Sequence, residues 1–186
     1  MSQLKTSLVQ CDLRWEDPHA NHTHLAKLLG DLDSRDTDLI VLPEMFATGF
    51  TMNSREMAQP MAESQSVAWL QAQAQARGCV MTGSVAVVDD GQYYNRMVWA
   101  TPDGELRYYD KRHLFRMAGE HERYGMGSAR QIVDMLLAEC AAGGAEVRLK
   151  IHPAGHCIQW IECTCRKNRS FGQYCEHIAA FMIHVD

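Results

Sequence analysis

Hydrophobic and polar positions in the first 110 residues alternate between the period of a helix and that of a strand. Two segments repeat apolar residues at spacings of three and four, which predicts amphipathic helices. Short runs rich in Val, Ile, Leu and Tyr lie between them and predict strands. The expected elements are strands at 4–13, 38–44 and 79–88, helices at 17–32 and 64–77, and a hairpin of 92–101 with 106–109. This order predicts an α/β fold with helices packed on a sheet.

Beyond residue 127 the pattern changes. Ser128 and Gln131 form a capping box at the start of a predicted amphipathic helix, and alternation over residues 147–151 predicts a strand. Cysteine and histidine then gather ahead of a last predicted helix at 178–185. We therefore divide the chain into residues 1–127, 128–151 and 152–186.

The composition narrows the class of protein. Hydrophobic residues make up 46% of the chain, which is enough for a buried core. No apolar run approaches the roughly 18 residues of a membrane span, and the first residues lack the apolar stretch of a secretory leader. Seven cysteines, an odd number in a chain without a leader, favour reduced thiols or a metal site over disulfides. We expect a cytoplasmic protein.

Charge is distributed unevenly. The chain carries a net charge of −5. Residues 148–186 have five basic and three acidic residues, a net charge of +2, so the first 147 residues carry −7. Four of the seven cysteines also fall in the last 30 residues. Two different kinds of sequence are joined in this chain.

Glu44 lies at the carboxyl end of one predicted strand and Lys111 just after the end of another, where α/β sheets place their ligand sites. A glutamate can take up a proton and a lysine can stabilise an oxyanion, and an acyl-transfer site needs both. A glutamate and a lysine at strand ends are also commonly a solvated surface pair. The residue types alone leave both interpretations open.

Four stretches between residues 4 and 127 resemble the nitrilase, or carbon–nitrogen hydrolase, superfamily, most closely its bacterial omega-amidase branch. They are residues 41–50, 82–86, 95–96 and 109–118. The resemblance implies an αββα sandwich that hydrolyses small amides of dicarboxylic or keto acids through a cysteine thioester, with no organic cofactor. By the same resemblance Glu44 is the general base, Lys111 stabilises the oxyanion, and Glu120 is a second glutamate that orients the site.

The nucleophilic cysteine of that family has no counterpart here. The resemblance ends near Ile132, and the position where a Cys-Tyr-Asp-Leu-Arg motif should fall, near residues 145–147, contains no cysteine. Cys140 is the nearest substitute, but it falls on an apolar stripe near a predicted helix C-terminus, where burial and the helix dipole raise a thiol pKa. We expect Cys140 to be a core residue. The sequence thus predicts a truncated sandwich, inactive as a hydrolase.

The last segment has the spacing of a zinc site. Cys163-Thr-Cys165 is followed after nine residues by Cys175-Glu-His177, which supplies three thiols and one imidazole for a tetrahedral Zn²⁺ ion. Scattered reduced thiols and disulfides are the alternatives. The spacing resembles the SWIM zinc finger, a family found in proteins that bind DNA or other proteins.

Basic residues at 166, 167 and 169 in the loop of this module would suit phosphate contacts, although any solvated loop can carry such residues. Residues 128–151 faintly resemble a helix–strand unit of flavin-linked oxidoreductases but lack a Gly-x-Gly-x-x-Gly turn, so we expect only a packing unit. Three interpretations compete: an amidase-derived domain, an α/β scaffold for a zinc-dependent nucleic-acid- or protein-binding module, and a mosaic chain with no evolved activity. We favour the first, with the zinc module attached. Four-layer members of the family pair through their sheets and helices, so the resemblance leaves a homo-oligomer open.

Overall fold

The structure is a computed structural model that describes residues 5–30, 32, 37–129, 147–151 and 158–163. The chain divides into two compact units. One unit is Ser7–Ala129, and the other combines Met1–Thr6 with Arg130–Asp186. The predicted boundaries at 127 and 151 stay predictions.

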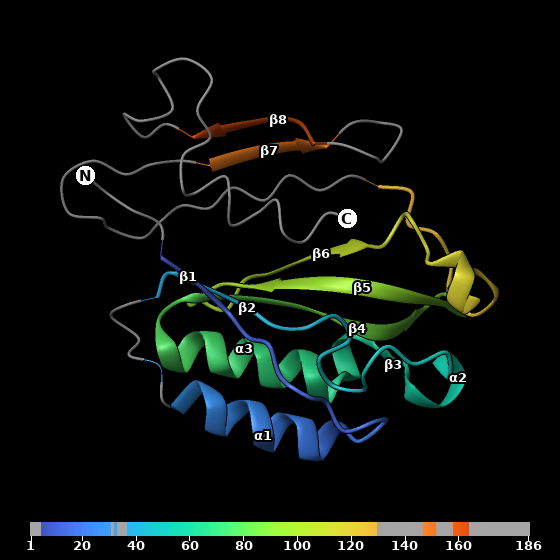
Figure 1. The fold of residues 1–186 in the computed structure, drawn as a ribbon, viewed down its shortest axis with the longest axis horizontal. Helices are drawn as coiled ribbons and strands as arrows, with labels where there is room; N and C mark the ends of the chain where they lie inside the picture. The colour runs from blue at the N-terminus through green and yellow to red at the C-terminus, as the bar shows by residue number, and fades with distance from the viewer. Residues whose placement is uncertain (1–4, 31, 33–36, 130–146, 152–157, 164–186) are drawn as a thin grey trace. The chain divides into compact units, whose positions relative to one another are not determined.

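A mixed sheet forms the larger unit (Figure 1). Its strands lie in the order β1 (Thr6–Leu8), β2 (Leu39–Val41), β4 (Val80–Asp89), β5 (Gln92–Ala100) and β6 (Leu106–Asp110), and the short β3 (Gln59–Pro60) pairs with β4. β2 and β3 run parallel to β4, whereas β5 is antiparallel to both of its neighbours. The carboxyl end of β2 therefore lies beside Thr82 near the start of β4, and Thr82 pairs with Trp99 near the end of β5.

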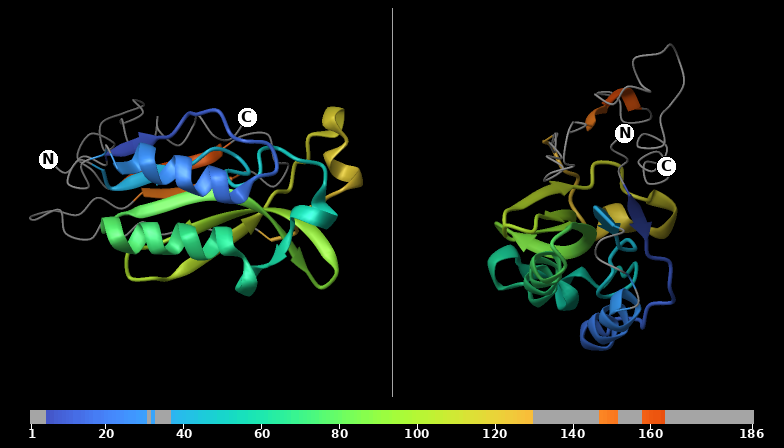
Figure 2. Two further views of the ribbon diagram at one scale, coloured as in Figure 1. Left: turned by 90° about the horizontal axis from the view of Figure 1, so that it is seen from below. Right: turned by 90° about the vertical axis from the view of Figure 1, so that its left-hand side faces the viewer.

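Two helices, α1 (Pro18–Gly30) and α3 (Gln65–Arg77), cover one face of this sheet (Figures 1 and 2). Their ends are fixed by local chemistry. The Asp17 carboxylate accepts the N–H of Ala20 at 2.9 Å at the start of α1, and Ser64 Oγ accepts an N–H in the first turn of α3. Gly78, with a φ of 64°, ends α3 in the left-handed region that glycine favours.

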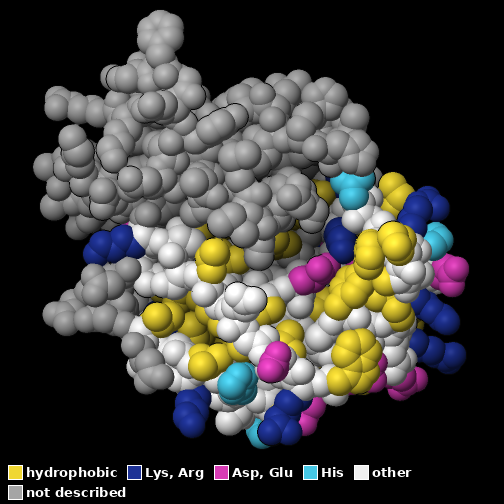
Figure 3. All heavy atoms as spheres, in the orientation of Figure 1, with side chains coloured by type: hydrophobic (Ala, Val, Ile, Leu, Met, Phe, Trp, Pro, Cys, Tyr) yellow, Lys and Arg dark blue, Asp and Glu magenta, His cyan; other side chains and the backbone are white. Residues whose placement is uncertain are grey.

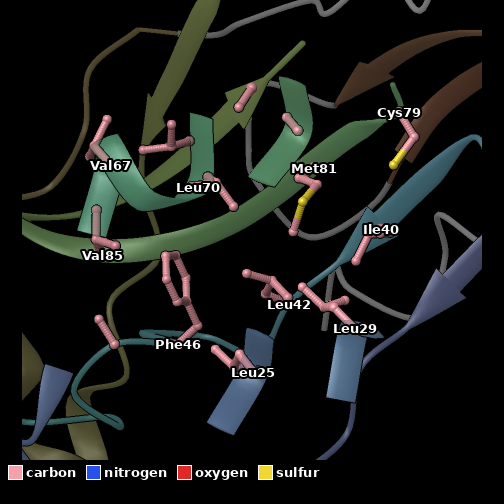
Figure 4. Packing of buried hydrophobic residues seen from close by; sticks show 14 of the residues in the cluster. Leu25, Leu29, Ile40, Leu42, Phe46, Val67, Leu70, Cys79, Met81 and Val85 are labelled. Carbon is pink, nitrogen blue, oxygen red and sulfur yellow. The ribbon is translucent and has the colours of Figure 1, made fainter. Parts of the chain in front are cut away.

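The core lies between these helices and the sheet. Apolar residues at the helical spacing point from α1 and α3 toward alternate residues of β2 and β4 (Figure 4). The fully buried contributors include Leu25, Leu29, Ile40, Leu42, Phe46, Leu70 and Met81. The opposite face of the sheet carries a smaller cluster of Met45, Ala86 and Tyr124.

Most predicted elements of the larger unit are confirmed. The helices at 17–32 and 64–77, the strands at 38–44 and 79–88 and the hairpin are present with shifted ends. The strand predicted at 4–13 is too long, because β1 spans only Thr6–Leu8 of the described residues. Val9 still donates its N–H to the Val41 carbonyl at 2.9 Å, and the chain then leaves the sheet. The hydrophobic pattern did not predict α2 (Ser54–Met57), β3 or the 3₁₀ turns η2 (Met61–Glu63), η3 (Arg116–Ala118) and η4 (Glu120–Glu122).

The described part of the smaller unit is an antiparallel pair, β7 (Val147–Ile151) with β8 (Ile158–Cys163). The strand at 147–151 was predicted and is confirmed, whereas β8 was not predicted. The helices predicted after Ser128 and at 178–185 lie outside the described residues. Within the part of the chain that the structure describes, no helix is long and apolar enough to cross a membrane.

Candidate active site

Glu44 is placed by a tight turn that follows β2. Leu42 donates its N–H to the Thr82 carbonyl at 2.8 Å and so continues the sheet for one residue. Met45, with a φ of 47°, then adopts the left-handed region and donates its N–H to Ser84 Oγ at 2.8 Å. Gly83 lets this turn pack closely against β4, because a Cβ at position 83 would lie 2.8 Å from the Phe46 ring. The Glu44 side chain thereby projects from the carboxyl edge of the sheet.

Lys111 and Glu120 come from the segment that follows β6. The Lys111 N–H donates to the Asn95 carbonyl at 2.9 Å, and the Lys111 carbonyl accepts the Gly127 N–H at 3.0 Å. Glu120 lies in η4 with a fully buried side chain, and its Oε2 accepts the Phe115 N–H at 2.6 Å. Backbone hydrogen bonds thus fix both residues on the face opposite the helices.

The structure brings the three predicted residues together. Lys111 Nζ donates to Glu44 Oε1 at 2.8 Å and to Glu120 Oε2 and Oε1 at 3.0 and 3.2 Å. The side chains of Glu44, Lys111 and Glu120 are 49%, 27% and 0% exposed, so the cluster opens to solvent on the Glu44 side. Burial alone would lower the pKa of Lys111, but the hydrogen bonds to both carboxylates outweigh it and raise that pKa.

Asn95 completes this cluster, and sequence reasoning assigned it no role. Its side chain is buried on β5, and its Nδ2 donates to Glu44 Oε1 at 2.7 Å and to Glu120 Oε1 at 3.0 Å. A signal was present in the sequence. Asparagine is depleted in strands, and a buried amide needs hydrogen-bond partners, so an asparagine inside a predicted strand invites the question of what it binds.

Aromatic side chains border the cluster. Lys111 Nζ lies 5.0 Å from the centre of the Phe50 ring, and the half-exposed Phe115 ring lies 6.3 Å from that of Phe50. Hydrophobic side chains gather beside charged ones on the surface around η3 and η4, which are drawn as the yellow coil in Figure 1 (Figure 3). Tyr124 packs against Met45 and Ala86 on the same face of the sheet. Burial and then the charges of Glu120 and Glu16 raise the pKa of Tyr124 and keep its phenol neutral.

Such an arrangement pairs an accessible carboxylate with a cation that a second, buried carboxylate holds in place. These are the groups that accept a proton and stabilise an oxyanion in acyl transfer. The sequence profile of the carbon-nitrogen hydrolase family matches residues 5–158. This chain belongs to the carbon–nitrogen hydrolase family. The profile match extends to residue 158, beyond Ile132, near which the resemblance was expected to end.

Curated amidases are similar to this chain in sequence. The chain is 45% identical to the omega-amidase YafV of Yersinia enterocolitica over 134 residues, which are 72% of this chain and 51% of that protein. It is 33% identical to the 2-oxoglutaramate amidase of Bacillus subtilis over 125 residues, 66% of this chain and 48% of that protein. The chain spans about half the length of these curated relatives.

Solved structures of nitrilase superfamily members also resemble this chain. XC1258 from Xanthomonas campestris, described as a CN-hydrolase superfamily protein with an arsenic adduct in the active site, superposes with a TM-score of 0.67 at 44% identity. That superposition covers 72% of this chain and 49% of XC1258. Nit3 of Saccharomyces cerevisiae, a nitrilase superfamily member, superposes with a TM-score of 0.61 at 26% identity, over 72% of this chain and 52% of Nit3.

No cysteine among the described side chains joins the cluster of this carbon–nitrogen hydrolase chain. Cys79 is buried in the main core, and Cys11 is partly buried against that core. Burial, the largest cause for each, raises both thiol pKa values, which disfavours the nucleophilic thiolate. Cys140 lies outside the described residues.

The predicted zinc ligands are for the most part also outside the described residues. Cys163 is the last residue of β8, whereas Cys165, Cys175 and His177 fall beyond it. Among the described side chains there is no group of three or more His, Cys, Asp or Glu that could hold a metal ion. The zinc site stays a prediction.

Proposed function

We propose that this chain carries the acid–base part of an omega-amidase site, and that this site binds small amides of dicarboxylic or keto acids without hydrolysing them at an enzymatic rate. The observation that carries the proposal is the convergence of Glu44, Lys111 and Glu120 with Glu44 open to solvent. The relatives support the substrate class, since they include an omega-amidase and a 2-oxoglutaramate amidase.

In the proposed chemistry, the amide carbonyl oxygen lies against Lys111 Nζ, whose charge stabilises the oxyanion that forms during attack. Glu44 takes the proton of the attacking group and passes it to the departing ammonia. Glu120 is buried and holds Lys111 through both of its oxygens. A thiol that attacks the amide would form a C–S bond, break the C–N bond and release ammonia, and water would then cleave the thioester.

We further propose that the missing part is the thiol. Thioester formation requires an activated thiolate next to Glu44, and Cys11 and Cys79 both belong to the core on the helix side of the sheet. Cys140 is predicted to lie on an apolar helical stripe. Since the members of a catalytic unit act together, the base and lysine alone would leave activity orders of magnitude below that of an intact enzyme.

Ammonia release from 2-oxoglutaramate tests this proposal. The wild-type chain and a Cys140→Ala variant are compared with buffer, and we expect all three to give the same rate. Turnover in the wild type that disappears in Cys140→Ala would contradict the proposal and would identify Cys140 as the nucleophile. Turnover that persists in Cys140→Ala but disappears in Lys111→Met would contradict the requirement for a thiol at that position.

For the last segment we propose a structural zinc ion held by Cys163, Cys165, Cys175 and His177. The support is the donor set, three thiols and one imidazole in two close pairs, which suits zinc. We expect one zinc ion per purified, untagged chain, and loss of structure in residues 152–186 on adding a chelator. A folded, reduced sample without zinc would contradict this site. A nucleic-acid or protein partner, self-association and a mosaic origin stay predictions.

A further inference from the structure

The buried amide of Asn95 lies where the groups of the open site meet. We propose that Asn95 is the positioning residue of this site: it ties Glu44 to Glu120 through one oxygen of each, holds Lys111 between them, and leaves Glu44 Oε2 as the oxygen that takes the proton. This inference rests on the proposed amidase-type function and assigns a task to individual atoms within it.

The charges of the cluster explain why a neutral donor is needed. Glu44 and Glu120 place two carboxylates around a single ammonium group, so one negative charge is left over. Asn95 Nδ2 carries two hydrogens and donates to both carboxylates, at 2.7 Å to Glu44 Oε1 and 3.0 Å to Glu120 Oε1. Asn95 therefore brings the two like charges together without changing the net charge, and its burial excludes water from competing for these bonds.

The hydrogen bonds also distinguish the two glutamates. Both oxygens of Glu120 are used, Oε1 by Asn95 and Lys111 and Oε2 by Lys111 and the Phe115 N–H. Glu44 accepts from Asn95 and Lys111 through Oε1 alone. No described residue donates to Glu44 Oε2, and the side chain is half exposed. Among the described residues, Glu44 is thus the one carboxylate of the cluster with an oxygen that accepts no hydrogen bond beside the ammonium group.

The backbone of Asn95 contributes to the same arrangement. Its carbonyl accepts the Lys111 N–H at 2.9 Å, so one residue fixes Lys111 through the main chain and through the carboxylates. Across the sheet Asn95 pairs with Ala86, whose small side chain packs with Met45 and Tyr124 on the same face.

Two variants of Asn95 separate positioning from a merely structural role. Asn95→Leu removes both donors, so Glu44 turns toward water and Lys111 loses a partner. Asn95→Asp has the same shape but adds a third carboxylate beside Lys111. Thr82→Val is the matched control, because it removes one buried hydrogen bond, from Thr82 Oγ1 to the Val98 carbonyl, elsewhere in the sheet.

The measurement is the titration of Lys111, followed by NMR in the full chain labelled with ¹³Cε-lysine. We expect the Lys111 titration midpoint to fall by about one pH unit in Asn95→Leu, to stay or rise in Asn95→Asp, and to remain unchanged in Thr82→Val. A loss of packing alone would move both Asn95 variants in the same direction. Equal midpoints in Asn95→Leu and Thr82→Val, or a fall in Asn95→Asp, would overturn the proposal. Because this readout needs no turnover, its failure is separate from a failure of the amidase proposal in the ammonia assay.

Discussion

Two neighbouring residues of β5, Asn95 and Arg96, point to opposite faces of the sheet, and each joins a cluster with a residue at the end of β6. The open cluster consists of Glu44, Asn95, Lys111 and Glu120. The closed cluster consists of Asp89, Arg96 and Asp110. Both contain two carboxylates and one cation, so their charges alone do not show which one does chemistry.

Access to the cation separates the two clusters. Arg96 is 3% exposed, and its guanidinium binds Asp110 through two parallel hydrogen bonds of 2.6 and 2.9 Å and Asp89 through a third. The Tyr108 ring lies 4.0 Å from its central carbon and covers one side. In the open cluster the fully buried group is instead the carboxylate of Glu120, and the Lys111 side chain is 27% exposed. A substrate oxygen could approach Lys111 but not Arg96.

The largest expected effect of a substitution is in the closed cluster. Arg96→Leu leaves Asp110 without its buried partner, and we expect the free energy of unfolding to fall by about 3–5 kcal/mol in urea denaturation. The control is Arg107→Leu, which breaks the exposed pair with Glu105 and should cost less than about 1 kcal/mol. Equal losses of stability in the two variants would contradict the claim that Arg96 stabilises the fold through the closed cluster.

Gly127→Ala should disturb both clusters through the backbone that joins them. A Cβ at this position would lie 2.1 Å from the Asp110 carbonyl oxygen, so the chain must shift where Asp110 passes into Lys111. We expect a loss of about 1–3 kcal/mol in thermal or urea unfolding. Gly30→Ala adds the same methyl group where no atom lies within 4 Å, and a comparable loss there would argue against the steric cause.

Lys111→Met should show a loss of similar size that depends on pH, roughly 2 kcal/mol at neutral pH. The pKa of Lys111 in the folded chain is raised above its ordinary value of 10.5. Its contribution to stability is therefore complete below that value and is lost as the pH rises through the folded pKa. Unfolding of wild type and variant between about pH 8 and about pH 11.5 checks this, with the exposed Lys27→Met as control. A difference that grows with pH would contradict the sign.

Phe50→Leu should have the smallest effect, because it keeps apolar volume and removes only the ring face 5.0 Å from Lys111 Nζ. We expect a coupling energy of about 0.5–1 kcal/mol between Phe50 and Lys111. A double-mutant cycle of Phe50→Leu with Lys111→Met measures it from four unfolding curves. A coupling of zero would show that the ring only borders the site.

The sequence predicted those parts of this arrangement that depend on local pattern. The helical spacing of apolar residues located α1 and α3, and the runs rich in Val, Ile, Leu and Tyr located the main strands of the sheet. Glu44 and Lys111 could be placed at one edge because both follow strands of the sheet. The short elements between residues 54 and 63 have no repeating pattern that could be recognised.

The role of Asn95 could not be predicted in the same way. It depends on the register that sets Asn95 beside Lys111 and on the direction of one amide between two carboxylates. Strand alternation does place Asn95 and Arg96 on opposite faces, but it does not give their partners, because these come from strands and turns far apart in the chain.

The most direct test of the account is whether a small amide binds at the open cluster and not at the closed one. The full chain, labelled at the lysine Cε and at the arginine Nε, is titrated with 2-oxoglutaramate and followed by NMR. We predict a saturable shift of the Lys111 signal, absent from the Arg96 signal and from that of the exposed Lys27. A Lys111 signal that does not move at saturating concentrations of the amide, or an equal shift at Lys27, would contradict the account.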